Sequence, residues 1–459
     1  MLRIFRHYCS APALFLCVCE TLAVALALYA AASMLLPADA AGGRLIAAAL
    51  VPALVNAVLM FGMGLYDPPH VANFRRALPR LVACLCIGAP ILGRSLSFAG
   101  TGETQTLYYL AWTVLVVACI VLARMLATPL ARTGFSPRRV VVVGAGRLAA
   151  EIEQLMARAH AHSRTEVSGY VALGNETREV PEARLKSSEA PLLDVVRNSA
   201  AKEIVVAADD RRGISLQPLL DARMEGVTVT SFLSFWERET RRVNLRALDP
   251  SWLIFSDGFH IGSATNAVLK RALDITASVL LLLLTLPTLL VAAIAIKLDS
   301  KGPILYRQER IGRRGQIFHI AKFRTMRVDA EQMSGPQWAS VDDPRVTRVG
   351  RFLRRMRIDE LPQILNVLRG EMSFVGPRPE RPHFVRHLAA EIPFYQERHR
   401  VRPGITGWAQ INYPYGASIE DAREKLSYDL YYIKNFSFLF DLLIILSTAK
   451  AVFLDGGGR

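Results

Sequence analysis

Long apolar runs occupy the first 127 residues and constrain the fold more than any other feature of the chain. They cover about 11–36, 45–66, 81–98 and 107–127, and each is near the ~20 residues that an α-helix needs to cross a bilayer. The pattern predicts four transmembrane helices in a membrane region at 1–130. The first run is longer than the ~7–15 apolar residues of a signal peptide, so we interpret it as a span.

Basic residues in the loops predict the orientation of these helices. Short cytoplasmic loops carry an excess of lysine and arginine. Arginines stand before the first run, between the second and third, and after the fourth: Arg3, Arg6, Arg75, Arg76, Arg80, Arg132, Arg138 and Arg139. The two other loops hold only Arg44 and Arg94. The N-terminus and everything after residue 130 are therefore predicted to be cytoplasmic.

Charge and cysteine content restrict the partners and the compartment. The chain has 55 Lys and Arg against 40 Asp and Glu, a net charge of +15, which suits anionic headgroups and phosphorylated substrates. We expect membrane contact and no nucleic-acid partner. All six cysteines lie between Cys9 and Cys119, so the remaining 340 residues hold no thiol and a disulfide framework is excluded there.

A strand, a glycine turn and a helix follow the membrane region. Residues 138–148 read RRVVVVGAGRL, with Gly144-x-Gly146-x-x-Ala149 before a helical pattern. Further strand-like pieces alternate with helical ones, which predicts a Rossmann-like α/β domain at 137–257. Such a turn can seat a phosphate on backbone amides, but the acid expected to hold a ribose is represented only by Asn175 and Glu176. Nucleotide binding and a purely regulatory or assembly role both stay open.

Residues 267–296 form a fifth apolar segment, interrupted by Pro287. Proline removes a helical hydrogen bond and kinks the axis. Basic residues flank both ends: Lys270, Arg271, Lys297, Lys301 and Arg307. Since positive residues favour the cytoplasmic side, both ends are predicted on one face, as a re-entrant helix-break-helix. The alternative is a kinked spanning helix with an external C-terminal domain.

Three charged residues at the start of this segment are candidate substrate-binding residues. Lys270 and Arg271 would lie at headgroup depth near a lipid phosphate. Asp274 would hold one of them through an i,i+3 or i,i+4 contact.

The segments after the hairpin carry a specific resemblance. They read GPILYRQERIGRRGQIFHIAKFRTM at 302–326, RFLRRMRIDELPQILNVLRGEMSFVGPRPE at 351–380 and RPGITGWAQIN at 402–412. Together with KRALD before the hairpin, they resemble the bacterial polyprenyl-phosphate sugar-1-phosphate transferases, the monotopic phosphoglycosyltransferase superfamily. The N-terminal helices and α/β domain are similar to its large, exopolysaccharide-initiating branch, which includes undecaprenyl-phosphate glucose and galactose phosphotransferases.

The resemblance implies an activity and an architecture. It implies an enzyme of the bacterial inner membrane, multi-pass, that takes a hexose-1-phosphate from a UDP-sugar donor to undecaprenyl phosphate and releases UMP. A covalent phosphosugar intermediate and a Mg²⁺ requirement are also implied. The expected fold class is membrane α plus α/β, in which a mainly helical cytoplasmic catalytic domain occupies 265–459 and includes the re-entrant helix.

Asp359 and Glu360 are the candidate catalytic residues. A carboxylate is ionised at pH 7 and is a competent nucleophile at phosphorus once cations quench the phosphate charge, so Asp359 is the candidate nucleophile. Side chains of helix neighbours diverge by about 100°, so Glu360 is expected to bind Mg²⁺ or to assist proton transfer from the acceptor. The plainer alternative is that Asp359 only caps the following helix.

Several cations surround this pair in the sequence. Arg354 and Arg357 are expected near it, and Arg378, fixed between Pro377 and Pro379, suits a bidentate grip on a diphosphate. Glu380 could complete the metal shell. Arg402 lies in a glycine-containing loop with Trp408, whose indole would stack on a base or anchor at the membrane interface.

The sequence is compatible with two other functions. One is a UDP-sugar-modifying, NAD-dependent oxidoreductase or epimerase built on the glycine turn, although no Tyr-x-x-x-Lys pair occurs in the chain. The other is a non-catalytic membrane scaffold for polysaccharide assembly. The sequence leaves open the transferred sugar and the oligomeric state, a homo-oligomer included.

Overall fold

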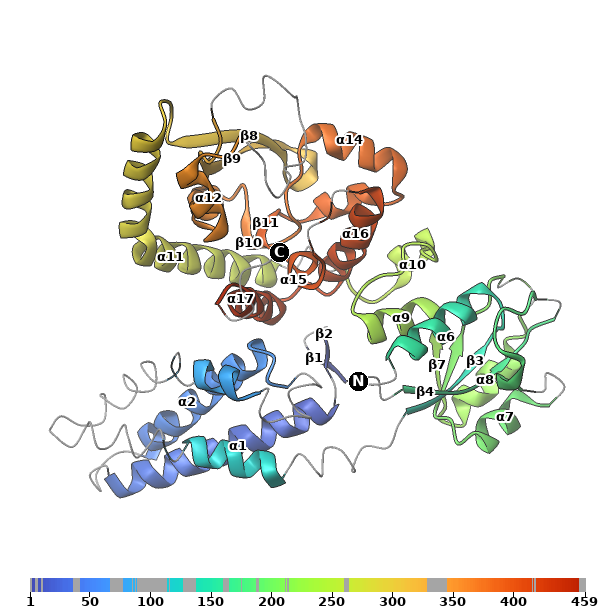
Figure 1. Cartoon of the computed structure of the whole chain (residues 1–459). Helices are drawn as coiled ribbons and strands as arrows, with labels where there is room; N and C mark the ends of the chain where they lie inside the picture. The colour runs from blue at the N-terminus through green and yellow to red at the C-terminus, as the bar shows by residue number, and fades with distance from the viewer. Residues whose placement is uncertain are drawn as a thin grey trace. The chain divides into compact units, whose positions relative to one another are not determined.

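In a computed structural model, the chain forms two compact units, made mainly of Tyr8–Asp249 and of Pro250–Arg459 (Figure 1). The structure describes residues 2–4, 7–9, 11–35, 42–66, 77–84, 86, 88, 114, 116–126, 138–159, 165–174, 176–186, 190–210, 212, 214–259, 264–327, 345–414, 416 and 418–453. Two short strands, β1 (Leu2–Ile4) and β2 (His7–Cys9), precede the first helix. The predicted division into three domains at 1–130, 137–257 and 265–459 stays a prediction.

The described residues of the N-terminal apolar runs are helical, except for the turn at 63–66 that ends the second run. The first two correspond to α1 (Ala11–Leu35) and α2 (Gly42–Gly62). Helical residues at 77–84 and 116–126 fall within or beside the third and fourth runs, whose remaining parts lie outside the described residues. By length and composition, two described helices could cross a membrane, α1 through Ala13–Ala30 and the later helix Ala264–Asp299. The four-span arrangement therefore stays a prediction.

A buried polar cluster joins α1, the turn that follows α2 and the helical residues 116–126. Arg124 donates from Nε to Glu20 Oε1 at 2.7 Å, and Tyr66 donates from its hydroxyl to Glu20 Oε2 at 2.8 Å. Arg124 and Glu20 are only 6% and 2% exposed. Charged side chains in apolar helix bundles face one another because each needs a partner, so this pair fixes how α1 packs on residues 116–126.

The α/β part is a five-stranded parallel sheet in the order β5-β4-β3-β6-β7. Its strands are β3 (Arg138–Val143), β4 (Thr165–Val171), β5 (Leu185–Lys186), β6 (Glu203–Val206) and β7 (Thr228–Ser231). The 3₁₀ turn η1 (Glu182–Arg184) and the helices α6 (Arg147–Ala159), α7 (Leu192–Asn198), α8 (Gln217–Met224) and α9 (Phe232–Thr240) connect them. Val141, Val143 and Ile204 are buried at the centre, as expected for strands covered on both faces. The predicted α/β fold is confirmed.

The second unit is mainly helical with two small sheets. Its first elements are α10 (Pro250–Phe255), α11 (Ala264–Asp299), the antiparallel strands β8 (Leu305–Ile311) and β9 (Ile317–Phe323) joined by η2 (Arg313–Gly315), α12 (Arg348–Arg355), η3 (Ile358–Gln363) and α13 (Ile364–Arg369). The parallel pair β10 (Ser373–Val375) and β11 (Gly404–Thr406) follows, with α14 (Pro382–Glu391), η4 (Tyr395–Arg400), α15 (Trp408–Asn412), α16 (Ile419–Lys434) and α17 (Phe438–Phe453).

The predicted helix-break-helix is a single bent helix, α11, with Pro287 inside it. Figure 1 shows that α11 turns sharply along its length before it reaches β8. Its apolar side chains are largely exposed, among them Leu283, Leu284 and Leu290 at 65%, 78% and 59%. Soluble proteins rarely expose so much contiguous apolar surface to water. The exposed leucines therefore favour a lipid environment for the bent part of α11.

Candidate active site

A short 3₁₀ segment presents the two adjacent carboxylates. After α12, Arg357 adopts a left-handed conformation with φ of +58°, and the chain enters η3, which contains Asp359 and Glu360. The helix expected immediately after Asp359 begins only at Ile364, with Gln363 as its N-cap residue and no side-chain cap. The alternative that Asp359 only caps this helix is therefore wrong.

Asp359 is buried and lacks a hydrogen bond to its carboxylate within the described part of the chain. Its relative exposure is 9%. Burial raises the pKa of Asp359, as does the charge of Glu360, while Lys322, Arg354 and Arg357 oppose that rise. A carboxylate that is desolvated and held by no donor keeps its lone pairs available for attack.

Glu360 is held by two cations. Lys322 Nζ and Arg378 NH2 both donate to Glu360 Oε1 at 2.8 Å. Although burial alone would raise it, these two charges lower the pKa of Glu360 below its usual range. Such a carboxylate is a weak proton acceptor, so its contacts suit it better to orienting Lys322 and Arg378 than to moving protons.

Lys322 was missed as a site residue, because its contact with Glu360 depends on how β9 packs against η3. It lies on β9 opposite Tyr306 of β8, and successive side chains of a strand point to opposite faces. Lys322 therefore lies on the opposite face of the two-stranded ribbon from its neighbour Ala321.

Hydrogen bonds hold all three carbonyl groups of the Pro-Arg-Pro turn. Gly404 N donates to Pro377 O at 2.9 Å, Arg398 NH2 to Arg378 O at 3.1 Å and Arg310 NH1 to Pro379 O at 3.0 Å. These contacts and the two proline rings restrict the backbone, so the Arg378 side chain projects from a fixed support.

Arg398, a second residue that was missed, forms a buried ion pair beneath this turn. Its NH2 lies 2.9 Å from Asp429 Oδ2, and the two side chains are 6% and 2% exposed. Arg398 NH1 also donates to the Tyr395 hydroxyl at 2.6 Å. Nothing in the sequence near 398 indicated this partner, because the pairing depends on how η4 packs on α16.

The two predicted metal ligands have other partners. Glu360 accepts from Lys322 and Arg378, and Glu380 Oε2 lies 3.7 Å from Arg310 NH1. Within the described residues, no group of three or more His, Cys, Asp or Glu could hold a metal ion. These side chains therefore do not fit a magnesium site by themselves, and the requirement for Mg²⁺ stays a prediction.

The predicted arginines divide into two places. The charges of Arg354 and Arg357 favour a lower pKa of Asp359. Arg354 Nε also donates to Thr325 Oγ1 at 2.9 Å. Arg402 instead has Arg271 and Arg313 as charged neighbours, which together with burial lower its pKa.

The residues at the start of α11 make internal contacts. Lys270 Nζ donates to Asp441 Oδ2 at 2.6 Å, to Val375 O at 3.0 Å and to the Tyr432 hydroxyl at 3.2 Å. Arg271 donates to the carbonyl groups of Val367 and Leu368 at 2.6 Å, at the C-terminal end of α13. These bonds tie the start of α11 to α13, β10, α16 and α17.

Asp274 does not hold Lys270 or Arg271, so that predicted contact is wrong. Its Oδ1 accepts from Ser373 Oγ at 2.8 Å and Phe374 N at 2.9 Å, and its Oδ2 has no hydrogen-bond partner among the described residues. Trp408 is 5% exposed and packs against Tyr431 and Phe440, which contradicts both the stacking and the interface role expected for it.

The glycine turn of the α/β sheet is filled by the protein's own carboxylates. Arg147 N and Leu148 N donate to Asp209 at 2.7 and 3.0 Å, and Ala145 N donates to Glu176 Oε2 at 2.9 Å. A Cβ atom at Gly146 would lie 2.3 Å from Asp209 Oδ2. These amides are the groups that would seat a pyrophosphate, so this arrangement counts against a dinucleotide there.

Comparison with known proteins assigns the second unit to a family. A model of the bacterial sugar transferases matches residues 265–455. The exopolysaccharide production protein PSS of Rhizobium leguminosarum bv. phaseoli is 44% identical over 201 residues, which cover 42% of this chain and 99% of that protein. The chain belongs to the bacterial sugar transferase family.

Other members of the sugar transferase family match a smaller share of their length. The UDP-N-acetylgalactosamine-undecaprenyl-phosphate N-acetylgalactosaminephosphotransferase of Aeromonas hydrophila is 46% identical over 223 residues, 49% of this chain and 52% of that protein. The undecaprenyl-phosphate glucose phosphotransferase of Komagataeibacter xylinus is 50% identical over 188 residues, 39% and 35% of the two chains. The matched region thus spans about half or less of these two relatives.

Proposed function

We propose that this protein transfers a sugar-1-phosphate from a UDP-sugar to undecaprenyl phosphate through a covalent intermediate on Asp359. The observation that carries the proposal is the contrast within the pair: Asp359 is buried and accepts no described hydrogen bond, whereas Glu360 is clamped by Lys322 and Arg378. One carboxylate is thereby available for attack, and the other orients cations for a diphosphate.

In the first half-reaction, an Asp359 carboxylate oxygen attacks the phosphorus that carries the sugar. The bond between this phosphorus and the oxygen bridging to the uridine-bearing phosphate breaks, and UMP leaves with the bonding electron pair. Arg378 and Lys322 would face the negative charge that develops on the diphosphate, where fixed cations stabilise a transition state. The product is a sugar-phosphoryl ester of Asp359.

In the second half-reaction, a phosphate oxygen of undecaprenyl phosphate attacks the same phosphorus and the bond to Asp359 breaks. The carboxylate is regenerated, and a polyprenyl diphosphate sugar forms. No proton has to be removed from an ionised acceptor phosphate, which agrees with the low pKa of Glu360.

The names of the relatives support the two substrates and the purpose of the reaction. The Aeromonas and Komagataeibacter proteins are named as undecaprenyl-phosphate phosphotransferases, and the Rhizobium protein as an exopolysaccharide production protein. Since one name specifies glucose and another N-acetylgalactosamine, we leave the sugar open and propose the initiation of an exopolysaccharide.

We further propose that catalysis takes place at the cytoplasmic face of the inner membrane, with α11 re-entrant. The sharp bend of α11 and its exposed apolar side chains support this, as does the supply of nucleotide sugars in the cytoplasm. Protease accessibility of the C-terminus in sealed, oriented membrane vesicles tests it. Cleavage from the periplasmic side would overturn the topology.

A requirement for Mg²⁺ is a separate proposal, because this ion is commonly bound by one or two carboxylates together with substrate phosphates. Chelation with EDTA should abolish UMP release, and added Mg²⁺ should restore it. Full activity in EDTA would contradict the proposal.

The deciding experiment follows UMP release from a panel of UDP-sugars and locates the covalent adduct by mass spectrometry. We expect the sugar-phosphoryl group on the peptide that contains Asp359. Asp359→Asn should lower UMP release by at least about a thousandfold, whereas Glu391→Gln, at an exposed carboxylate, should not change it. An adduct on any other side chain would overturn the proposed nucleophile.

A further inference from the structure

We propose that a cavity on the other face of the β8–β9 ribbon binds the phosphate group of an anionic phospholipid. The inference concerns lipid binding and does not depend on the proposed chemistry at Asp359. It rests on the cavity, on two arginines that face each other across it, and on an apolar wall beside them.

The cavity lies between the ribbon and α13. Its volume is about 490 Å³, within the range of small-ligand sites. Its lining residues are Leu305, Arg307, Ile317, Phe318, His319, Ala321, Leu365, Arg369 and Glu371. Arg307 is paired with Ala321 across the ribbon, and the next pair, Tyr306 and Lys322, takes the opposite face. The ribbon therefore separates this cavity from the side on which Lys322 contacts Glu360.

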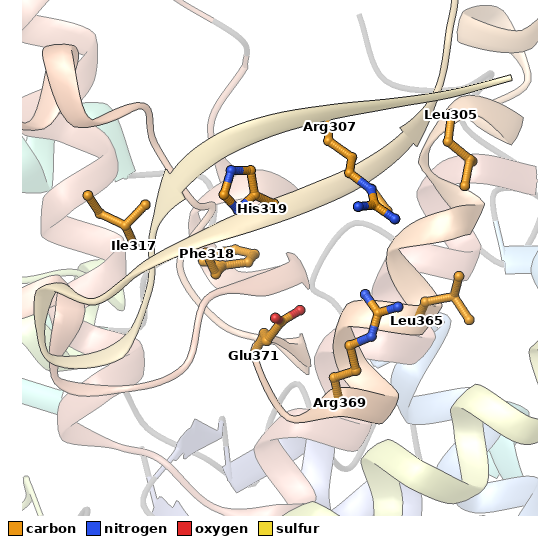
Figure 2. A pocket seen from close by; sticks show the side chains of 9 residues that line it. Leu305, Arg307, Ile317, Phe318, His319, Leu365, Arg369 and Glu371 are labelled. Atoms are coloured by element: carbon orange, nitrogen blue, oxygen red, sulfur yellow. The ribbon is translucent and has the colours of Figure 1, made fainter. Parts of the chain in front are cut away.

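Two arginines from different elements meet in this cavity. Figure 2 shows the guanidinium groups of Arg307 on β8 and Arg369 at the end of α13 pointing toward one another. Neither has an ion pair or hydrogen bond with another described side chain. Facing like charges repel, and a phosphate placed between them would accept bidentate hydrogen bonds from both.

Glu371, the carboxylate in the lining, does not neutralise this pair within ion-pair distance. It instead accepts from Asn366 Nδ2 at 2.6 Å. Asn366 Oδ1 accepts from Ala321 N at 2.9 Å, so Glu371 is held at one side of the cavity. In that position it can accept a hydrogen bond from a hydroxyl group of a lipid headgroup.

The apolar part of the lining favours a lipid over free phosphate. Ile317 and Leu365 are 58% and 37% exposed, and both border the same cavity as the arginines. Side chains of this kind bind acyl or glycerol carbons by burying apolar surface, which inorganic phosphate cannot offer.

The elements that build the cavity are joined to the membrane helix. Arg271, near the start of α11, binds the carbonyl groups of Val367 and Leu368 immediately before Arg369. At its other end α11 leads directly into β8, which carries Arg307. Both guanidinium groups are therefore attached close to an end of α11, where headgroup phosphates would lie if its bend is inserted in lipid.

The test measures phosphatidylglycerol retained by the full chain in neutral detergent, by native mass spectrometry over a lipid titration. We expect the wild type to retain this lipid and Arg307→Gln or Arg369→Gln each to weaken its binding about tenfold, the loss of a charge-assisted hydrogen bond. Arg314→Gln is the matched control, because Arg314 is an exposed arginine on the same ribbon but outside the cavity lining. It should change binding less than twofold.

A second variant keeps the charges and fills the apolar half of the cavity. Leu365→Trp should also weaken phosphatidylglycerol binding, with an unchanged melting temperature as the check on folding. Equal losses in Arg314→Gln and Arg307→Gln would overturn the proposal in favour of general surface charge. Displacement of the lipid by equimolar inorganic phosphate, or preferential retention of undecaprenyl phosphate through the same two arginines, would overturn the assignment to a phospholipid.

Discussion

At the scale of single residues, Asp359 and Glu360 are neighbours whose ionisation is driven in opposite directions. Burial raises the pKa of Asp359, whereas Arg378 and Lys322 lower the pKa of Glu360 despite its burial. Environments that separate the pKa values of two carboxylates also separate their roles. Here the two pKa values differ because Lys322 and Arg378 donate hydrogen bonds to Glu360 and not to Asp359.

The raised pKa of Asp359 predicts that its removal stabilises the protein. A carboxyl group with a raised native pKa contributes stability that is present at low pH and lost as the pH rises through that pKa. At pH 7 the ionised, buried side chain therefore destabilises the fold. Asp359→Asn should raise the melting temperature at pH 7 by roughly 2–4 °C, the shift that about 1 kcal/mol produces in a domain of this size.

Melting curves at pH 4 and pH 7 check this prediction. The gain from Asp359→Asn should be smaller at pH 4, where the wild-type carboxyl is closer to neutral. Glu391→Gln serves as the control and should show no gain at either pH. A lower melting temperature for Asp359→Asn at pH 7 would contradict the argument.

The charge of Lys322 is expected to influence the pH at which activity is lost on the acid side. In the proposed reaction UMP release requires ionised Asp359, so activity should fall as the pH drops through its pKa. Lys322 lowers that pKa, and Lys322→Met should therefore move the acid limb of kcat/KM to higher pH as well as reduce the rate. The control is Lys202→Met, at an exposed residue immediately before β6. A limb that stays in place or moves to lower pH would refute the assignment.

The site residues that lie in one linear motif could be predicted from the sequence. Those that only the folded structure places beside this motif could not. Asp359, Glu360 and Arg378 follow one another within 20 residues. Lys322 joins Glu360 from 38 residues away, and Arg398 reaches the Arg378 carbonyl only because η4 packs beneath the turn. Such contacts depend on tertiary packing and cannot be derived from spacing.

At the scale of elements, the Pro-Arg-Pro turn depends on the buried Arg398–Asp429 pair. Arg398→Met leaves the Asp429 carboxylate without its cation and should cost about 3–5 kcal/mol of stability. Adding Asp429→Leu removes the stranded charge, so the double variant should recover most of this loss. In both variants the Arg378 carbonyl lacks its donor. The KM for the UDP-sugar should therefore be higher than in the wild type in the single and in the double variant.

Thermal unfolding together with steady-state UMP release separates the two effects. Arg400→Met is the matched control, because Arg400 forms an exposed ion pair with Glu397 and such pairs contribute about 0–1 kcal/mol. A double variant that regained stability and the wild-type KM together would show that Arg398 does not position the turn.

Element types were more predictable than the ways in which elements end. The glycine turn and the alternation of strand-like with helical pieces predicted the Rossmann-like α/β domain, and the proline at 287 predicted a change of direction in α11, which remains one helix. The 3₁₀ segment before α13 was not foreseen, because helical spacing alone does not reveal that Arg357 takes a left-handed conformation. The contacts of Asp274 with β10 were hidden for a similar reason: an i,i+4 partner on the same helix looked nearer in sequence.

At the scale of the whole molecule, the residues of the candidate active site all lie in the second unit. The site extends from Lys322 to Asp429, inside Pro250–Arg459. The Rhizobium relative is matched over 99% of its length by 201 residues, so a protein of about that size exists without the remaining parts. The N-terminal helices and the α/β sheet are therefore expected to modify the reaction and not to perform it.

A fragment of residues 250–459 should retain UMP release within about tenfold of the full chain, because a unit with its own core and complete site can fold alone. Detergent-solubilised fragment and full chain would be compared at equal concentration. The same fragment with Asp359→Asn sets the background. A folded fragment that releases no UMP would place a necessary residue in the first unit.

The Glu20–Arg124 pair has a consequence for how the protein is made. Its two members are 104 residues apart in the chain, and a ribosome needs about 5–20 s to add that many residues. In the predicted four-span topology, the first helix would leave the translocon during this interval, before the Glu20 carboxylate has met its cation. We therefore expect early insertion to be reversible, and membrane integration to become permanent only when Arg124 arrives.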